Sequence, residues 1–100
     1  METRRLNYKE KIIKNITETD LMIATSGIVI SKVDSNFVLD DGSGKVSVFL
    51  EDNEVNNGDY VRVFGRIMSF SEGVEIQGEF TQNLNTINKQ LHKKIVNFLE

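Results

Sequence analysis

The chain has 100 residues, of which 39% are hydrophobic and 27% charged, and its formal net charge is -3. A chain of this length and composition folds around one core, which excludes a two-domain enzyme, a disordered tail and a fibre. It has no cysteine and one histidine, His92, so disulfides and Cys- or His-rich metal sites are excluded too, and we expect neither a metal nor a cofactor.

The N-terminal segment is basic, and its secondary structure is ambiguous. Residues 1–14 contain five bases and two acids, and residues 8–16 are compatible with a short helix or with an extended leader. We therefore set residues 1–19 apart as a basic leader. Residues 21–31 are rich in β-branched side chains and predict a strand that bends at Gly27.

The next segments predict a β-hairpin. After a polar turn at 32–36, the apolar residues 37–39 lead into DDGSG at 40–44, a run of residues that form tight turns. In the following segment, 45–50, every second residue is apolar, which predicts a strand with one buried face. Phe49 lies on the opposite face of this strand.

Two more strands complete the predicted sheet. A polar connection at 51–58, with room for one helical turn, leads to a strand at 60–67 that is interrupted by Gly65, and a fifth strand covers 74–80. One side of the fourth strand carries Val61, Val63 and Ile67, and the other carries Tyr60, Arg62, Phe64 and Arg66. Five short strands with interior glycines predict a small closed or half-closed β-barrel over residues 20–83.

The C-terminal segment, 84–100, predicts an amphipathic helix with Asn85 or Thr86 as its N-cap. Its apolar residues recur at steps of three and four and form a stripe of Ile87, Leu91, Ile95 and Phe98. Because the stripe runs to the end of the sequence, beyond the reach of a small barrel, we expect it to bind a partner subunit or a second copy of the chain. The alternative is that it folds over the open end of its own barrel.

The sequence lacks catalytic motifs. It contains no phosphate-binding loop, dinucleotide-binding fingerprint or nucleophile elbow, and we expect His92 to be a solvated residue on the polar side of the helix. The adjacent acids Asp40 and Asp41 precede Gly-Ser-Gly, so we interpret them as turn residues that bind backbone amides rather than as catalytic or metal-binding carboxylates. We expect no enzymatic activity.

The apolar runs are too short for a membrane protein. The longest, 21–24 and 27–30, fall far short of the ~20 residues that a membrane-spanning helix needs. Residues 1–5 are charged without an apolar segment after them, unlike an export signal. We expect no membrane contact and a cytoplasmic location, near the nucleoid in an archaeon or in the nucleus of a eukaryote.

The acidic residues are concentrated on the predicted barrel, where residues 33–83 contain ten acids and three bases. Binding of nucleic acid by charge alone needs a basic surface, because it is driven by the release of counterions from phosphates. Nucleic acid would therefore bind here weakly, through stacking, through the basic ends of the chain or with the help of a partner.

Two motifs resemble the oligonucleotide/oligosaccharide-binding (OB) fold, namely FVLDDGSGK at 37–45 and GDYVRVFGR at 58–66. The resemblance covers residues 21–100 and is strongest to the middle subunit of replication protein A and its archaeal and telomeric-complex relatives. It implies a mostly β fold, with a five-stranded Greek-key barrel and a C-terminal helix. In that family the terminal helix associates with helices of other subunits.

The same resemblance implies stacking positions for single-stranded DNA. The aromatic on the strand after the family's DDGTG-like turn corresponds to Phe49, and the aromatic after the fourth strand corresponds to Phe70. Other candidate contacts to nucleic acid are Lys32, Lys45, Ser47, Arg62 and Arg66. The alternative for each base is a solvated charge, and for each phenylalanine a ring that covers a barrel edge or fills space beneath the helix.

Two functions of different classes follow. The first is a non-enzymatic accessory subunit of a DNA replication, repair or end-protection complex, which binds single-stranded DNA weakly and docks through its helix. The second is a protein adaptor without nucleic-acid contact, such as a small accessory subunit of a replicative DNA polymerase. An RNA-binding module of translation is a remote third option, because such modules are usually basic.

Overall fold

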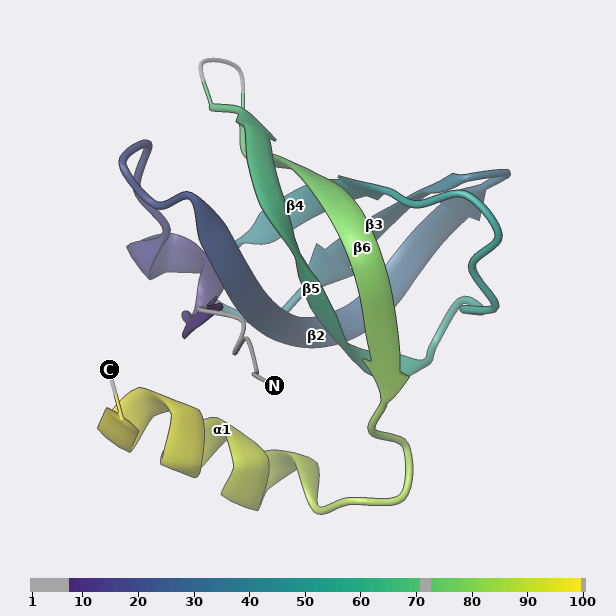
Figure 1. Cartoon of the computed structure of the whole chain (residues 1–100). Helices are drawn as coiled ribbons and strands as arrows, with labels where there is room; N and C mark the ends of the chain where they lie inside the picture. Colours follow the sequence, from purple (N-terminus) through teal and green to yellow (C-terminus); the bar gives the residue numbers. More distant parts are fainter. Residues whose placement is uncertain (1–7, 71–72, 100) are drawn as a thin grey trace, which may run out of the picture.

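The computed structural model describes residues 8–70 and 73–99 (Figure 1). Its elements are β1 (Lys9–Glu10), the 3-10 helix η1 (Ile13–Asn15), β2 (Met22–Val33), β3 (Asn36–Asp40), β4 (Lys45–Phe49), β5 (Tyr60–Ser69), β6 (Glu75–Asn83) and α1 (Lys89–Leu99). All five predicted strands are present, as β2 to β6. The two-residue strand β1 was not predicted.

The strands β2 to β6 close into a ring. The sheet order is β1-β2-β3-β4-β6-β5, and β5 pairs back with β2. Neighbours within the ring are antiparallel except β4 and β6, which run parallel, and β1 adds to β2 in parallel. Because β5 and β6 exchange places relative to their order in the chain, the path is a Greek key. The predicted five-stranded barrel is therefore confirmed.

The long strand β2 joins the two halves of the barrel and is strongly curved (Figure 1). Its residues from Met22 to Ile28 pair with β5, and its residues from Ile28 onward pair with β3. At the changeover, a Cβ on Gly27 would lie 3.0 Å from the carbonyl oxygen of Asp40. A side chain has no room where the two strands approach so closely, which explains the glycine in this strand.

Most of the core comes from the alternating apolar residues of the strands, as the sequence predicts. In β4, Val46 and Val48 are buried, whereas Lys45 and Ser47 are exposed. Tyr60 is an exception, because it was predicted to point outward but is only 2% exposed. Its ring lies beneath α1, 5.8 Å from the ring of His92 in an edge-to-face contact.

Residues 8–16 form the extended strand β1 followed by η1, so both alternatives for this segment are partly realised. Ile13 and Ile16 are buried and belong to the hydrophobic core. The N–H of Ile13 donates to Oδ2 of Asp41 at 2.9 Å, which fixes the N-terminal segment to the turn between β3 and β4. The chain before β2 therefore contributes to the barrel core.

The turn between β3 and β4 is held by its two aspartates. Oδ1 of Asp40 accepts from the N–H of Gly42 at 2.8 Å. Oδ1 of Asp41 accepts from the N–H groups of Ser43 and Gly44 at 2.8 and 3.2 Å. The interpretation of these carboxylates as turn residues is therefore confirmed.

The loop between β4 and β5 forms turns and no helical turn within residues 50–59. Val55 is buried and anchors this loop in the core.

The helix α1 begins later than predicted. Its first turn is capped by Asn88, whose Oδ1 accepts from the N–H of Leu91 at 2.9 Å, so Asn85 and Thr86 are not its N-cap. Asn85 instead accepts from the N–H of Tyr60 through its side-chain oxygen, at 2.8 Å. The prediction of the start was wrong because several asparagines near the helix are equally good caps in sequence, and Asn85 is engaged by the barrel.

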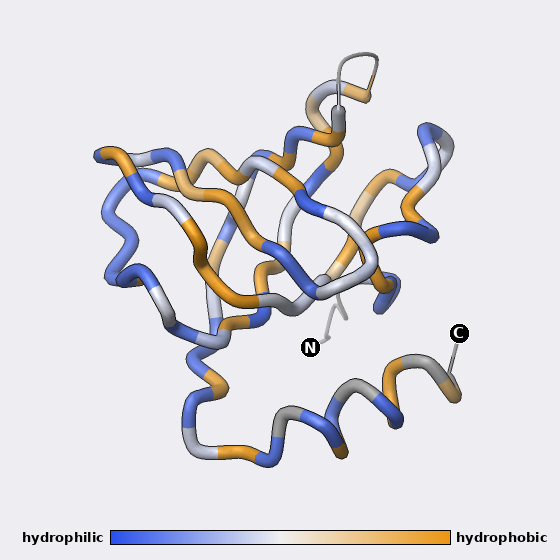
Figure 2. The backbone as a smooth tube through the Cα atoms, turned by 180° about the vertical axis from the view of Figure 1, so that it is seen from behind, coloured by the Kyte–Doolittle hydropathy of each residue, from blue (hydrophilic) through white to orange (hydrophobic). Residues whose placement is uncertain are grey.

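The helix touches the barrel through one narrow face. Val96 is buried and His92 is partly buried, and these two residues are one helical turn apart. The prediction that His92 is a solvated residue was wrong, because this histidine contacts the barrel. Figure 2 shows apolar positions interspersed with hydrophilic ones along α1.

Candidate nucleic-acid groove

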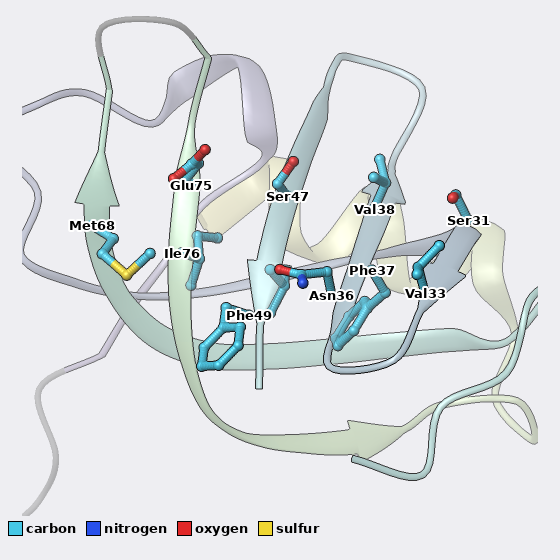
Figure 3. A pocket seen from close by; sticks show the side chains of 11 residues that line it. Ser31, Val33, Asn36, Phe37, Val38, Ser47, Phe49, Met68, Glu75 and Ile76 are labelled. Atoms are coloured by element: carbon cyan, nitrogen blue, oxygen red, sulfur yellow. The ribbon is translucent and has the colours of Figure 1, made fainter. Parts of the chain in front are cut away.

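A groove with a volume of about 310 Å³ lies over one side of the barrel (Figure 3). Its lining residues come from β2 to β6, and they are Ser31, Val33, Asn36, Phe37, Val38, Ser47, Val48, Phe49, Met68, Glu75 and Ile76. Phe37, Val48 and Ile76 also belong to the buried core. Part of the groove floor is therefore also part of the hydrophobic core.

Strand register explains why these residues meet. Paired residues of neighbouring strands point to the same face of a sheet. One row of paired residues crosses the groove as Ser31, Val38, Ser47 and Glu75. The next row runs as Val33, Asn36, Phe49 and Gln77. The outward face of β4 thus becomes the middle of a surface that spans four strands.

The groove offers an aromatic ring, apolar walls and neutral polar groups. Phe49 is partly buried, and Val33 and Met68 expose 66% and 52% of their surface beside it. Asn36 and Ser47 are exposed and supply amide and hydroxyl groups that both donate and accept hydrogen bonds. This combination suits a planar base with polar edges.

Of the predicted nucleic-acid contacts, the structure brings Ser47 and Phe49 together in this groove. Sequence reasoning missed Val33, Asn36 and Met68. Val33 and Asn36 flank the turn that joins β2 and β3, and their relation to Phe49 depends on cross-strand pairing. The alternation around Phe49 could have identified the face, but not its neighbours on other strands.

The predicted bases lie around the groove or away from it. Lys45 is exposed on the same face of β4 as Ser47, two residues closer to the turn. Nζ of Lys32 donates to the carbonyl of Val55 at 2.8 Å, so this side chain secures the β4–β5 loop. Arg66 pairs in register with Gln77 at the end of the second row, and its Nε lies 3.5 Å from a carboxylate oxygen of Glu79.

Phe70 does not line the groove. It is partly buried and packs against the hydrophobic core together with Val74. Its position fits the alternative of a ring that fills space in the barrel better than the alternative of a stacking platform.

Arg62 lies at a different place, beside α1. Its guanidinium is 3.6 Å from a carboxylate oxygen of Glu10, donates to Oε1 of Gln82 at 2.8 Å, and lies 3.5 Å from Nε2 of His92. The structure does not bring Arg62 to the groove, and this network gives its charge a role in holding the helix.

His92 lies on α1, contacts the barrel, and has a titratable side chain. Its Nε2 lies 3.2 Å from Oγ of Ser26, and Tyr60 packs against its ring. Burial and the nearby positive charge of Arg62 lower the pKa of His92 below its ordinary value of 6.5. The neutral form of the imidazole is therefore favoured where His92 lies between α1 and the barrel.

The predicted apolar stripe is exposed, but Ile87 lies before the first residue of α1 and is not part of the helix as predicted. Ile87, Leu91, Ile95 and Phe98 leave 40%, 56%, 48% and 87% of their surface in contact with solvent. The stripe therefore does not fold over its own barrel.

Within residues 8–70 and 73–99, no group of His, Cys, Asp or Glu side chains is arranged to hold a metal ion. Over the same part of the chain, no helix is long and apolar enough to cross a membrane.

Comparisons with known proteins were made at the level of sequence and of structure. No family model matches the sequence, and no curated protein matches it either. Among solved structures, the telomere capping protein Ten1 from S. pombe superposes with a TM-score of 0.78 at 18% identity, over 93% of this chain and 97% of that one. A chain of the S. pombe Stn1-Ten1 complex gives the same TM-score and identity, over 93% and 91% of the two chains.

A third match is a chain of a replication protein A heterotrimer bound to single-stranded DNA, with a TM-score of 0.56 at 23% identity, over 76% of this chain and 67% of that one. The chain has the OB fold. This confirms the resemblance seen in residues 37–45 and 58–66 at the level of fold, including the helix after the barrel.

Proposed function

We propose that this protein is a non-enzymatic OB-fold accessory subunit of a DNA replication, repair or end-protection complex. In this role it binds single-stranded DNA weakly through the groove and docks to a partner subunit through α1. The observation that carries the first part is the position of Phe49 in the middle of a groove that spans four strands.

The groove supports binding by stacking. A base that lies on the ring of Phe49 would have Val33 and Met68 as apolar neighbours and Asn36 and Ser47 as polar ones. Stacking on an aromatic side chain contributes about 1–3 kcal/mol per base and needs no particular sequence. The location on the outer face of the second and third barrel strands is also where OB folds bind oligonucleotides.

Charge makes the binding weak. Lys45 and Arg66 are the predicted bases that flank the groove, and Arg66 is partly neutralised by Glu79. Few phosphate contacts mean little gain from counterion release, so we expect a dissociation constant in the micromolar range or above at physiological salt.

The exposed stripe of α1 supports docking to another subunit. Three large apolar side chains on α1 are in contact with solvent, as is Ile87 just before the helix, and together they form a patch of the kind that binds a partner. Ten1 from S. pombe, which has a similar fold, was crystallised in a complex with Stn1. We propose a helix of another subunit as the partner, with a second copy of this chain as the option when no partner is present.

The second candidate is a protein adaptor that does not contact nucleic acid. Glu75 is the observation that favours it, because this acid is the one charged side chain among the described residues that line the groove. A carboxylate at this position repels phosphates. The two candidates differ in one property, which is saturable binding of single-stranded DNA.

Fluorescence anisotropy with a labelled single-stranded oligonucleotide at low salt separates the candidates. We expect saturable binding by the wild type and a loss of at least about fivefold in Phe49→Ala. Phe80→Ala is the matched control, because Phe80 is 45% exposed and stacks on Phe64 outside the groove lining. If the wild type does not bind, or if both variants lose affinity equally, stacking on Phe49 is contradicted and the adaptor function is favoured.

The proposed role associates the protein with chromosomal DNA. We therefore propose that it is located in the nucleus of a eukaryote or at the nucleoid of an archaeon. A general cytoplasmic location stays a prediction.

A further inference from the structure

Glu75 has a defined place in the groove. It is the first residue of β6 and pairs in register with Ser47, and the N–H of Ser47 donates to the neighbouring carbonyl of Val74 at 3.1 Å. Figure 3 shows the side chains of Glu75 and Ser47 on the same side of the sheet as Phe49. The carboxylate is exposed, and no hydrogen bond or ion pair with another residue of the described chain engages it.

Glu75 and Phe49 are close enough to act on one base. They lie on neighbouring strands, two positions apart along the parallel β4–β6 ladder, with the pair of Val48 and Ile76 between them. A strand spacing of about 4.8 Å and a two-residue repeat of about 6.7 Å place their Cα atoms about 8 Å apart. Both side chains leave the sheet on the same face. A base stacked on the ring of Phe49 therefore presents one edge toward the carboxylate.

We infer that Glu75 makes the groove selective for guanine. The inference rests on the proposed function, since it concerns which base occupies the groove. A carboxylate only accepts hydrogen bonds, and its two oxygens can accept two parallel ones. Guanine has two adjacent donors, N1–H and the N2 amino group, on its Watson–Crick edge.

The other bases satisfy the carboxylate less well. Cytosine and adenine each present one amino donor next to a ring nitrogen that accepts. Thymine presents a single N–H between two carbonyl oxygens, which the carboxylate repels. The expected order of affinity is therefore guanine first, cytosine and adenine next, and thymine last. A bidentate contact of this kind discriminates between bases by about tenfold.

This selectivity also gives a function to an acid that otherwise opposes binding. Glu75 repels the phosphates of every strand equally, but it attracts only bases that offer donors to it. A groove with few cations and one carboxylate therefore loses general affinity and gains discrimination between bases.

The test uses fluorescence anisotropy at low salt with thymidine oligonucleotides of about ten nucleotides. Four probes carry thymine, cytosine, adenine or guanine at one central position, and a fifth carries hypoxanthine. A single guanine avoids four-stranded structures. Hypoxanthine keeps N1–H of guanine but lacks the N2 amino group, so it isolates the second hydrogen bond.

Wild-type protein is expected to bind the guanine probe about tenfold more tightly than the thymine probe, with hypoxanthine in between. In Glu75→Gln this preference should fall below about threefold, while the affinity for the thymine probe rises. Glu54→Gln is the matched control, because it removes the same charge from an exposed position in the β4–β5 loop and should keep the preference.

The outcomes separate the inference from the proposed function. Equal binding of all five probes, or a guanine preference that survives in Glu75→Gln, overturns the inference and leaves single-strand binding intact. Equal affinity for guanine and hypoxanthine overturns the bidentate contact. Absence of binding for every probe contradicts the proposed function, and the inference with it.

Discussion

His92 and Arg62 form a contact that requires a neutral histidine. Nη2 of Arg62 lies 3.5 Å from Nε2 of His92, and a guanidinium can only donate hydrogen bonds. Nε2 must therefore be the acceptor, without a proton of its own. The contact joins β5 to α1 at the narrow face through which the helix meets the barrel.

This relationship predicts that docking of α1 depends on pH. Burial and then the charge of Arg62 lower the pKa of docked His92 below 6.5, so the undocked helix binds a proton more readily. Docking is therefore strongest above about pH 6.5 and weakens as the pH falls through the lowered pKa of His92. Other charged groups also lie near His92. Lys11 and Asp41 line the same small cavity as His92, and Glu10 lies beside Arg62.

Chemical shifts of the Val96 methyl groups, followed from about pH 7.5 to about pH 5, measure this effect. They should move toward values of an undocked helix in the wild type and stay constant in His92→Gln, whose side chain does not titrate. The same shift change in both proteins would show that another group controls docking.

Asp41 is predicted to contribute more to stability than its neighbour Asp40. Asp41 accepts from Ser43 twice, from Gly44 and from Ile13, whereas Asp40 accepts from Gly42. Replacing Asp41 by alanine should lower the free energy of unfolding by about 2 kcal/mol, and Asp40→Ala by less than about 1 kcal/mol. Urea denaturation of the two variants compares them directly, and equal losses would argue against the link through Ile13.

Gly65 is predicted to tolerate no side chain. A Cβ at this position would collide with the carbonyl oxygen of Gln77 on β6 and lie 2.9 Å from Cγ2 of Ile76. Backbone cannot yield without breaking the β5–β6 ladder, so Gly65→Ala should lose about 3 kcal/mol or more. In Gly44→Ala the obstacle is the side chain of Ile13, and we expect a smaller loss. Thermal unfolding that ranks the two variants the other way would contradict this explanation.

The exposed stripe of α1 predicts association of the isolated chain. We expect the wild type to self-associate at high concentration, because Leu91, Ile95 and Phe98 lie in water on one helix. Leu91→Asp should be folded and monomeric, whereas Val96→Asp should loosen the helix from the barrel, since Val96 is 6% exposed. Sedimentation that finds a wild-type monomer at every concentration would count against a docking role for the stripe.

Local sequence pattern predicts the barrel well. The alternation in 45–50 identifies the buried face of β4, and the DDGSG turn at 40–44 marks the hairpin, because both depend on neighbours in the chain. Gly27 and Gly65 were recognised for the same reason, as interruptions of an otherwise regular strand. The exposure of the helix stripe was also predicted correctly from its length and position.

The groove and the helix contact depend on residues far apart in sequence, and there local pattern fails. The sequence pattern places Arg62 on the outer side of its strand, yet its side chain lies beside α1. Its partner there is His92, which is thirty positions away in the sequence. Phe70 looks equivalent to Phe49 in a motif, but it packs against the core. Val33 and Asn36 carry no signal of their own and become groove residues through their register with β4.

The most direct test of the central claim maps where a single strand binds. Backbone amide shifts of the labelled protein are followed while a thymidine oligonucleotide with one central guanine is added at low salt. The account predicts changes at the two rows that contain Ser47 and Phe49, with little change at Phe64 and Phe80, which do not line the groove. Changes concentrated around Phe64 and Phe80, or no changes at saturating oligonucleotide, would contradict it.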